Sequence, residues 1–292
     1  MTTTPRKMPA FVNTASGTAA AALAALAENG AFDVRTVGPT QLQEAVRGAV
    51  SEGAPRVLVA GGDGTIGTAA SVLLGTDTEL ALLPGGTLNH FARDLGFTDD
   101  ARETLRIARE GVARAIDVGM VNNRLCLNTS SVGDYVRFIR IREYLERRHI
   151  GYRIASAIAA FVILFQFRRI VVKVSVDGNA RVYRTALVFI GVGERELKLP
   201  TLGNRAPHGR AGLHVMVVSS RTRARSLAIG LSAVARGVKS VSKTPEFDSF
   251  LVDACTISRR HGGFVALDGE LASLDAALEY ELRRDALRVV CP

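Results

Sequence analysis

The sequence contains no tryptophan, and all its aromatic residues together make up only 6% of 292 residues. Proteins that bind single-stranded nucleic acid stack bases on such rings, so this class of binder is poorly supported. Helix-turn-helix, zinc-finger and RNA-binding signatures are also missing from the sequence. We therefore expect no nucleic-acid partner, and the net charge of +9 needs another explanation.

Cysteine is scarce as well. Cys126, Cys255 and Cys291 are odd in number, far apart and without Cys-x-x-Cys spacing. This pattern fits neither a disulfide framework nor a zinc site, and it suits a reducing compartment. Met1–Ala10 includes no apolar segment of the secretory kind. Both observations favour a cytoplasmic protein.

Long hydrophobic runs are absent too. The longest, Ile154–Phe167, is interrupted by Ser156 and Gln166, and it is shorter than the ~17–25 residues that a membrane-spanning helix needs. We therefore expect no membrane span. A buried helix is the favoured interpretation, and an interfacial helix that dips into one leaflet is the alternative.

The positive charge that is present, from 37 basic and 28 acidic residues, is compatible with an anionic partner such as a membrane surface. Alternatively, the positive net charge only keeps the protein soluble. Between residues 134 and 149, Arg137, Arg140 and Arg147 lie at spacings that put them roughly on one helix face. This segment is either an ordinary amphipathic surface helix or a docking site for anionic lipid, worth ~1 kcal/mol per basic residue.

The chain reads as two domains of different class. Short apolar runs alternate with helical stretches up to about residue 116, which predicts an α/β domain with an open parallel sheet over residues 1–119. Residues 120–292 are richer in paired short strands, and we expect an antiparallel, β-sandwich-like domain. A helical insertion is expected over Tyr135–Phe167 and a further helix over Ser226–Val241.

Three loops rich in glycine and small polar residues each follow a predicted strand and precede a predicted helix. They are Asn13–Gly17, Gly61–Thr65 and the segment from Pro84 to Asn89. Because the carboxyl ends of parallel strands meet at one edge, all three can face one nucleotide. Backbone N–H groups there can hold phosphates, and Asp63 can hold Mg²⁺. A tight strand-to-helix turn with a capping Asp is the structural alternative. The loops match neither the P-loop nor the Gly-x-Gly-x-x-Gly fingerprint.

A last motif, Asp268-Gly269-Glu270, follows an apolar run. Taken alone, it is typical of a tight hairpin turn. Such a turn can also deliver carboxylates into a cleft, where phosphoryl transfer needs one near the attacking hydroxyl.

Taken together, these segments resemble the diacylglycerol-kinase catalytic family, which includes bacterial lipid kinases and sphingosine kinases. The resemblance rests on Gly61-Gly62-Asp63-Gly64-Thr65 and on the segment from Pro84 to Arg93. Asn13–Gly17, the segment from Ile116 to Gly133 and the acidic motif match in the family's order. The glycine motif alone is shared with NAD kinases and phosphofructokinases, whereas the combination is much more specific.

The resemblance implies a two-domain kinase, with ATP against the first domain and a lipid entering the cleft. Asp63 and Asp117 would organise catalytic Mg²⁺, and Asp268 and Glu270 would supply the general base. The nucleotide would be contacted by residues of the loops and of the second strand: Asn13, Ser16, Gly17, Thr36, Gly61, Gly62, Gly64, Thr65, Gly85, Gly86, Thr87 and Asn89.

The pattern departs from the family at two places. His90 stands where the family usually has Asp, and Arg210-Ala211 stands where many bacterial members have the Asp of a structural metal site. The departures suggest a divergent subfamily and make that structural metal doubtful.

The hypothesis is therefore a cytoplasmic, ATP- and Mg-dependent kinase that phosphorylates a diacylglycerol-like or sphingoid-like lipid hydroxyl and associates peripherally with anionic membranes. The alternatives are an NAD kinase and a catalytically weak nucleotide- or lipid-binding regulator. The oligomeric state stays open, with a homodimer among the options.

Overall fold

The computed structural model divides into two compact units, formed by residues 1–118 with 283–292 and by residues 119–282. The first unit thus includes C-terminal residues that the sequence pattern assigns to the second domain. The structure describes residues 7–166, 168–196, 203–206, 208–219, 222, 232 and 244–292.

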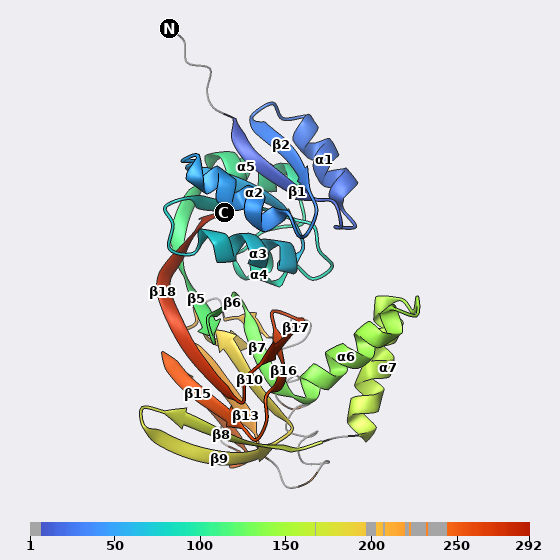
Figure 1. Ribbon diagram of the computed structural model, residues 1–292, viewed down its shortest axis with the longest axis vertical. Coiled ribbons are helices and arrows are strands. Elements are labelled where there is room, and N and C mark those ends of the chain that lie inside the picture. Colours follow the sequence, from blue (N-terminus) through green and yellow to red (C-terminus); the bar gives the residue numbers. More distant parts are fainter. Residues whose placement is uncertain are drawn as a thin grey trace. The chain divides into compact units, whose positions relative to one another are not determined.

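The first unit alternates strands and helices, as Figure 1 shows. Its elements are β1 (Met8–Asn13), α1 (Ala19–Ala27), β2 (Phe32–Val37), α2 (Leu42–Ser51), β3 (Arg56–Gly61), α3 (Asp63–Leu73), β4 (Glu79–Pro84), α4 (His90–Asp94), α5 (Ala101–Glu110) and the start of β5 (Val112–Val121).

The sheet of this unit is parallel, in the order β2-β1-β3-β4, and the end of β18 (Ala277–Cys291) adds a further parallel strand beside β4. The central strands β1, β3 and β4 are almost continuous apolar runs and are buried along most of their length. This pattern is typical of parallel strands covered on both faces. The predicted open parallel sheet is therefore confirmed.

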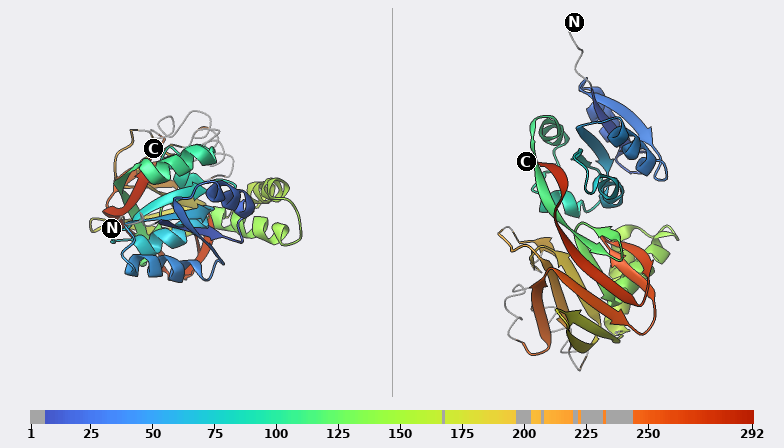
Figure 2. Two further views of the ribbon diagram at one scale, coloured as in Figure 1. Left: turned by 90° about the horizontal axis from the view of Figure 1, so that it is seen from above. Right: turned by 60° about the vertical axis from the view of Figure 1, so that its left-hand side comes forward.

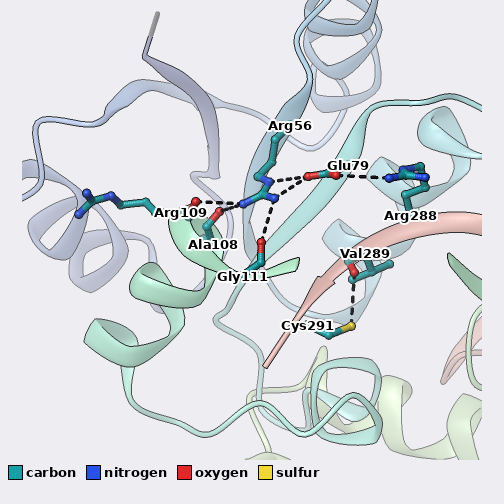
Figure 3. Close-up of polar contacts among 8 residues, drawn as sticks. All are labelled: Arg56, Glu79, Ala108, Arg109, Gly111, Arg288, Val289 and Cys291. Carbon is teal, nitrogen blue, oxygen red and sulfur yellow. Dashed lines mark hydrogen bonds and ion pairs between the residues drawn. The ribbon is translucent and has the colours of Figure 1, made fainter. Parts of the chain in front are cut away.

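At the edge of this sheet where the strands begin, an ion-pair network joins neighbouring elements (Figure 3). Arg56, at the start of β3, binds Glu79 at the start of β4, with a distance of 2.7 Å from Nε to Oε2. The same guanidinium donates to the carbonyls of Ala108 and Gly111 at the end of α5, and Arg288 of β18 approaches the other Glu79 oxygen at 3.5 Å. The network thus anchors α5 and the returning strand to one edge, opposite to the three loops.

The second unit is built mainly from antiparallel strands. Its elements are the end of β5, β6 (Arg124–Cys126), β7 (Thr129–Gly133), α6 (Asp134–Glu146), α7 (Tyr152–Phe165), β8 (Ile170–Val176), β9 (Asn179–Thr185), β10 (Leu187–Val192), β11 (Arg195–Glu196), β12 (Asn204–Arg205), β13 (Leu213–Val218), β14 (Phe247–Val252), β15 (Ala254–Arg259), β16 (Gly263–Leu267), β17 (Glu270–Leu274) and the first part of β18.

These strands form two principal sheets. One has the order β14-β13-β10-β7-β16-β17, and the other contains β18-β15-β8-β9 with β5 and β6. A single hydrophobic core takes side chains from both, for example Val188 and Val215 from the first and Val172 and Ile257 from the second. This arrangement confirms the expected antiparallel, sandwich-like second domain.

Both Asp-Gly pairs form two-residue hairpin turns. Asp177 and Gly178 have φ angles of 47° and 78° and connect β8 to β9, and Asp268 and Gly269 have φ angles of 48° and 86° and connect β16 to β17. Positive φ at both central positions is what a type I′ turn requires, and Asp-Gly tolerates it.

The helical insertion consists of two helices. Helices α6 and α7 are separated by a short connection in which His149 has a φ angle of 62°. They pack against each other and project from the strands of their unit (Figure 2). No described helix is long and apolar enough to cross a membrane. The helix expected over residues 226–241 lies outside the described residues.

Candidate functional site at the carboxyl edge of the parallel sheet

The first loop is tied to the second by a buried hydrogen bond. Asn13, the last residue of β1, donates from Nδ2 to Thr65 Oγ1 at 2.8 Å, and its Oδ1 accepts the backbone N–H of Ala15 at 3.0 Å. Both side chains are less than a tenth exposed. The predicted site residues Asn13 and Thr65 are thus brought together, and their side chains use each other as partners.

The first and third loops are joined through one carbonyl group. The Gly85 carbonyl accepts hydrogen bonds from Ser16 Oγ at 3.1 Å and from Thr18 Oγ1 at 2.7 Å. Sequence reasoning selected Ser16 and Gly85 but missed Thr18. A helix N-cap position directly after the loop was the available signal, since Ser and Thr favour such positions.

The glycines are required where the second and third loops touch. A Cβ added at Gly86 would lie 2.8 Å from the Cα of Gly62 and 2.9 Å from Asn89 Oδ1, and one added at Gly61 would lie 2.7 Å from the Thr65 side chain. Real Cβ atoms almost never come this close to other atoms. Close packing of the loops therefore explains these glycines without a ligand. The N–H of Gly86 itself donates to Asn89 Oδ1 at 2.7 Å.

Asp63 has a defined structural task. Its carboxylate accepts the backbone N–H of His90 on Oδ2 and that of Phe91 on Oδ1, both at 3.2 Å. These are the first two residues of α4, whose own N-cap residue, Asn89, makes no side-chain cap. Two of the roughly four acceptor sites of the carboxylate are used in this way, and the others remain for a metal-bound water or another donor.

Helix α3 starts at this edge without a side-chain cap, because its N-cap residue is Gly62. Its first N–H groups and its positive end lie beside the loops, as an anion-binding site requires. The other predicted nucleotide contacts, Gly17, Thr36, Gly64 and Thr87, are all exposed. The edge therefore combines uncapped N–H groups with exposed small residues.

Asp117 is placed differently from Asp63. It lies within β5, and its Oδ1 accepts the backbone N–H of Asp285 at 3.0 Å. In the described part of the chain, no group of three or more His, Cys, Asp or Glu side chains could hold a metal ion. The role of Asp117 in Mg²⁺ binding stays a prediction.

In the second unit, Asp268 holds a neighbouring loop by its carboxylate. Oδ1 accepts the backbone N–H groups of Asn128 at 2.7 Å and Thr129 at 2.9 Å, and Oδ2 accepts that of Leu127 at 2.8 Å. The Cys126 thiol donates to Oδ1 at 3.7 Å. We call Asp268 and these three N–H groups the Asp268 clasp. Burial raises the pKa of Asp268, and the three backbone hydrogen bonds oppose that rise.

Glu270 is in a different environment from Asp268, although only Gly269 separates them. It is exposed at the start of β17, where its backbone pairs with Leu267. The two carboxylates, between which the sequence could not assign the base, thus lie in different environments: Asp268 accepts several backbone N–H groups, and Glu270 is exposed.

The segment at Arg210 is held by a carboxylate elsewhere in the chain. Glu194 Oε2 accepts the Arg210 backbone N–H at 3.1 Å and its Nε at 3.4 Å. These hydrogen bonds lower the pKa of Glu194, the backbone one most strongly. Glu194 was not among the predicted residues, and no local sequence signal indicated it.

Comparison with known proteins gives a family match for most of the first unit. Residues 7–121 match the family model described as "Diacylglycerol kinase catalytic domain". The resemblance to the diacylglycerol-kinase catalytic family is confirmed. This segment contains all three loops and Asp117, whereas the acidic motif lies beyond it.

Curated relatives and solved structures agree with this family. The chain is 40% identical over 91 residues to the "Probable lipid kinase YegS-like" of Cronobacter sakazakii, covering 30% of each protein. It is 28% identical over 167 residues to a diacylglycerol kinase of Staphylococcus aureus, covering 56% of this chain and 52% of that protein. The chain thus matches about half or less of the length of these relatives.

The fold is shared over the full length with a crystal structure of a diacylglycerol kinase from Bacillus anthracis. The TM-score is 0.70 at 21% sequence identity, and the match covers 99% of this chain and 98% of that one. At this identity the likeness shows the fold.

Proposed function

We propose that this protein is an ATP- and Mg-dependent kinase that phosphorylates a lipid hydroxyl of the diacylglycerol or sphingoid type. The observation that carries the proposal is the meeting of three small-residue loops at the carboxyl edge of the parallel sheet, within the segment that matches a diacylglycerol kinase catalytic domain. The matched relatives are named lipid or diacylglycerol kinases, which favours this function over an NAD kinase.

On the nucleotide side, we propose that the N–H groups at the start of α3 hold ATP phosphates. The fit is supported by the uncapped helix end, whose N-cap residue Gly62 has no side chain. Mg²⁺ commonly keeps several waters and takes one or two carboxylates plus phosphate oxygens. Asp63, with acceptor sites left after capping α4, suits that type of binding. Bound Mg²⁺ would neutralise charge on the phosphates.

On the acceptor side, we assign positioning to Asp268 and the general base to Glu270. Asp268 accepts three backbone N–H groups and a thiol, so taking a proton there would weaken the clasp. In the proposed reaction the lipid oxygen bonds to the γ-phosphorus, its proton passes to the Glu270 carboxylate, and ADP leaves with the electrons of the broken P–O bond.

We further propose that the protein reaches its substrate from the membrane surface, because the acceptor is a lipid. The excess of basic residues favours anionic membranes.

The test is transfer of labelled γ-phosphate from ATP to separate acceptors in detergent: diacylglycerol, a sphingoid base, ceramide and phosphatidylglycerol, with NAD alongside. We expect an extractable labelled lipid only when Mg²⁺ is present. Glu270→Gln should lower kcat by roughly 10²–10⁴, the usual worth of a general base. Glu279→Gln, an exposed strand carboxylate of the same unit, should leave kcat unchanged. Label in NAD alone, or in no acceptor, would contradict the proposal.

A further inference from the structure

Helix α7 turns its largest apolar side chains to solvent. Ile154, Ile158, Phe161 and Phe165 are 62%, 38%, 62% and 60% exposed, and Leu164 is 42% exposed. Spacings of four, three and four residues put the first four on one stripe of the helix. The rings of Phe161 and Phe165 lie against each other, with centroids 4.4 Å apart. We call these five side chains the α7 apolar face.

The inner side of the same helix is formed by small residues. Ala155 and Ala159 are completely buried, and α7 packs against α6. A helix that only fills a protein core places its large apolar residues inward, so α7 has the reverse arrangement. The buried-helix interpretation of the sequence is therefore wrong, because burial is confined to the alanine side. Figures 1 and 2 show the α6–α7 hairpin projecting from the strands of its unit.

The charges that flank α7 along the chain have one sign. Residues 147–176 contain no Asp or Glu, and exposed arginines lie before and within the first turn of α7 and directly after it: Arg147, Arg148, Arg153, Arg168 and Arg169. An apolar stripe with aromatic rings and flanking arginines is typical of helices that lie in the headgroup region of a bilayer. The charge complements an anionic surface rather than a neutral or basic one.

Helix α6 is less suited to this task than its sequence suggested. Arg137 binds Asp134 at 2.7 Å and donates to the Gln166 carbonyl at 2.8 Å, which ties α6 to the end of α7. Arg140 lies over the Phe264 ring at 5.3 Å. The arginines of α6 thus serve contacts within the unit.

We propose that the α7 apolar face inserts into one leaflet of an anionic bilayer, with the flanking arginines at the lipid phosphates. The proposal rests on the proposed function, because a kinase of membrane lipids must reach them at the bilayer surface. The proposal adds which element enters the bilayer. The three loops and the Asp268-Gly269 turn do not identify that element.

The absence of tryptophan provides a direct reporter. Phe161→Trp introduces a single indole into the apolar face, and Val112→Trp introduces one at another highly exposed position, 76% exposed and in β5. With phosphatidylglycerol-containing vesicles, emission of the Phe161→Trp protein should shift to the blue and be quenched by brominated acyl chains. The Val112→Trp protein should show neither effect. Neutral phosphatidylcholine vesicles and added salt should both weaken the response.

Removing the rings should weaken vesicle binding in proportion to the area lost. Phe161→Ala with Phe165→Ala should lower the partition coefficient by roughly 10–100-fold, and Arg153→Glu should lower it for anionic vesicles only. Val112→Ala should leave it unchanged.

The result that would overturn the proposal is unchanged vesicle binding by the double variant. A blue shift that follows protein concentration without vesicles would overturn it too, since the face would then be an interface between copies. The detergent assay separates this failure from that of the proposed function: label transfer with no insertion refutes only the α7 proposal, and insertion with no label transfer to any lipid refutes only the kinase proposal.

Discussion

Replacing Asp268 by asparagine tests the Asp268 clasp. The carboxylate accepts hydrogen bonds on both oxygens, from Leu127 on one and from Asn128 and Thr129 on the other. An asparagine side chain has only one acceptor oxygen, and its NH₂ group is a donor. In either orientation of the amide, at least one backbone N–H would therefore face another donor.

The size of the expected stability loss follows from the orientation of the amide that loses the fewest hydrogen bonds. If the amide oxygen replaces Oδ1, the bonds from Asn128 and Thr129 are kept and that from Leu127 is lost. A hydrogen bond to a charged group contributes about 1.5–3 kcal/mol, and an unsatisfied buried N–H costs about 1–3 kcal/mol. The raised pKa of Asp268 shows that the cost of burying its charge exceeds the gain from these hydrogen bonds, so the expected loss rests on the unsatisfied N–H of Leu127. We expect a net loss of ~2 kcal/mol in the free energy of unfolding, which lowers Tm by about 4–8 °C in a chain of this size.

The second Asp-Gly turn supplies the matched control. Asp177 has nearly the same backbone conformation as Asp268 but is exposed. Asp177→Asn should change the free energy of unfolding by no more than ~0.5 kcal/mol, since Asn-Gly also suits a type I′ turn. Thermal unfolding followed by circular dichroism measures both variants. If Asp268→Asn melts at the same temperature as Asp177→Asn and the unchanged protein, the clasp contributes nothing to stability and the reasoning is refuted.

Three further predictions concern other parts of the chain. In Gly86→Ala the new Cβ should press against Gly62 and cost about 1–3 kcal/mol of strain, which should also weaken Mg-ATP binding measured by calorimetry. Gly67→Ala has open space around its Cβ and should change neither stability nor Mg-ATP binding in this way. All three cysteines are buried, and burial raises the pKa of Cys255 to about 12. The native protein should therefore resist a thiol reagent at pH 8 that labels the urea-unfolded chain rapidly. Rapid labelling of the native protein would contradict this burial. Burial lowers the pKa of His214 below its ordinary 6.5, so the stability contributed by neutral His214 is complete above pH 6.5 and is lost as the pH falls through the folded-state pKa. Between pH 7 and pH 5, the His214→Gln protein should therefore lose less free energy of unfolding than the unchanged protein. Equal losses in the two proteins would contradict the lowered pKa.

The sequence predicted that the three loops share one edge of the sheet because the signals for this arrangement are local. Each loop directly follows an apolar strand and precedes a helix, and parallel order then brings the strand ends Asn13, Gly61 and Pro84 to one edge. Thr18 was missed because its hydroxyl reaches a carbonyl 67 residues away. A pattern along the chain does not show which way such a side chain points.

The other differences between the sequence predictions and the structure also arise from contacts between residues that are far apart in the sequence. The Asp268 clasp spans about 140 residues of sequence, so the acidic motif alone could not distinguish a base from a positioning carboxylate. The return of β18 to the first unit is set by pairing of Val289 with Leu80. In α7, the composition indicated a buried helix, but only the three-dimensional packing shows that the alanines face inward.

The most direct test of the central claim is amide hydrogen exchange with and without Mg-ATP or a non-hydrolysable analogue. The account predicts slower exchange in peptides covering residues 13–18, 61–66 and 85–91, which form the carboxyl edge of the parallel sheet. Peptides covering residues 54–57 and 76–79, at the opposite edge, should exchange at unchanged rates. Protection confined to that opposite edge or to the second unit, with no change in the three loops, would contradict the account.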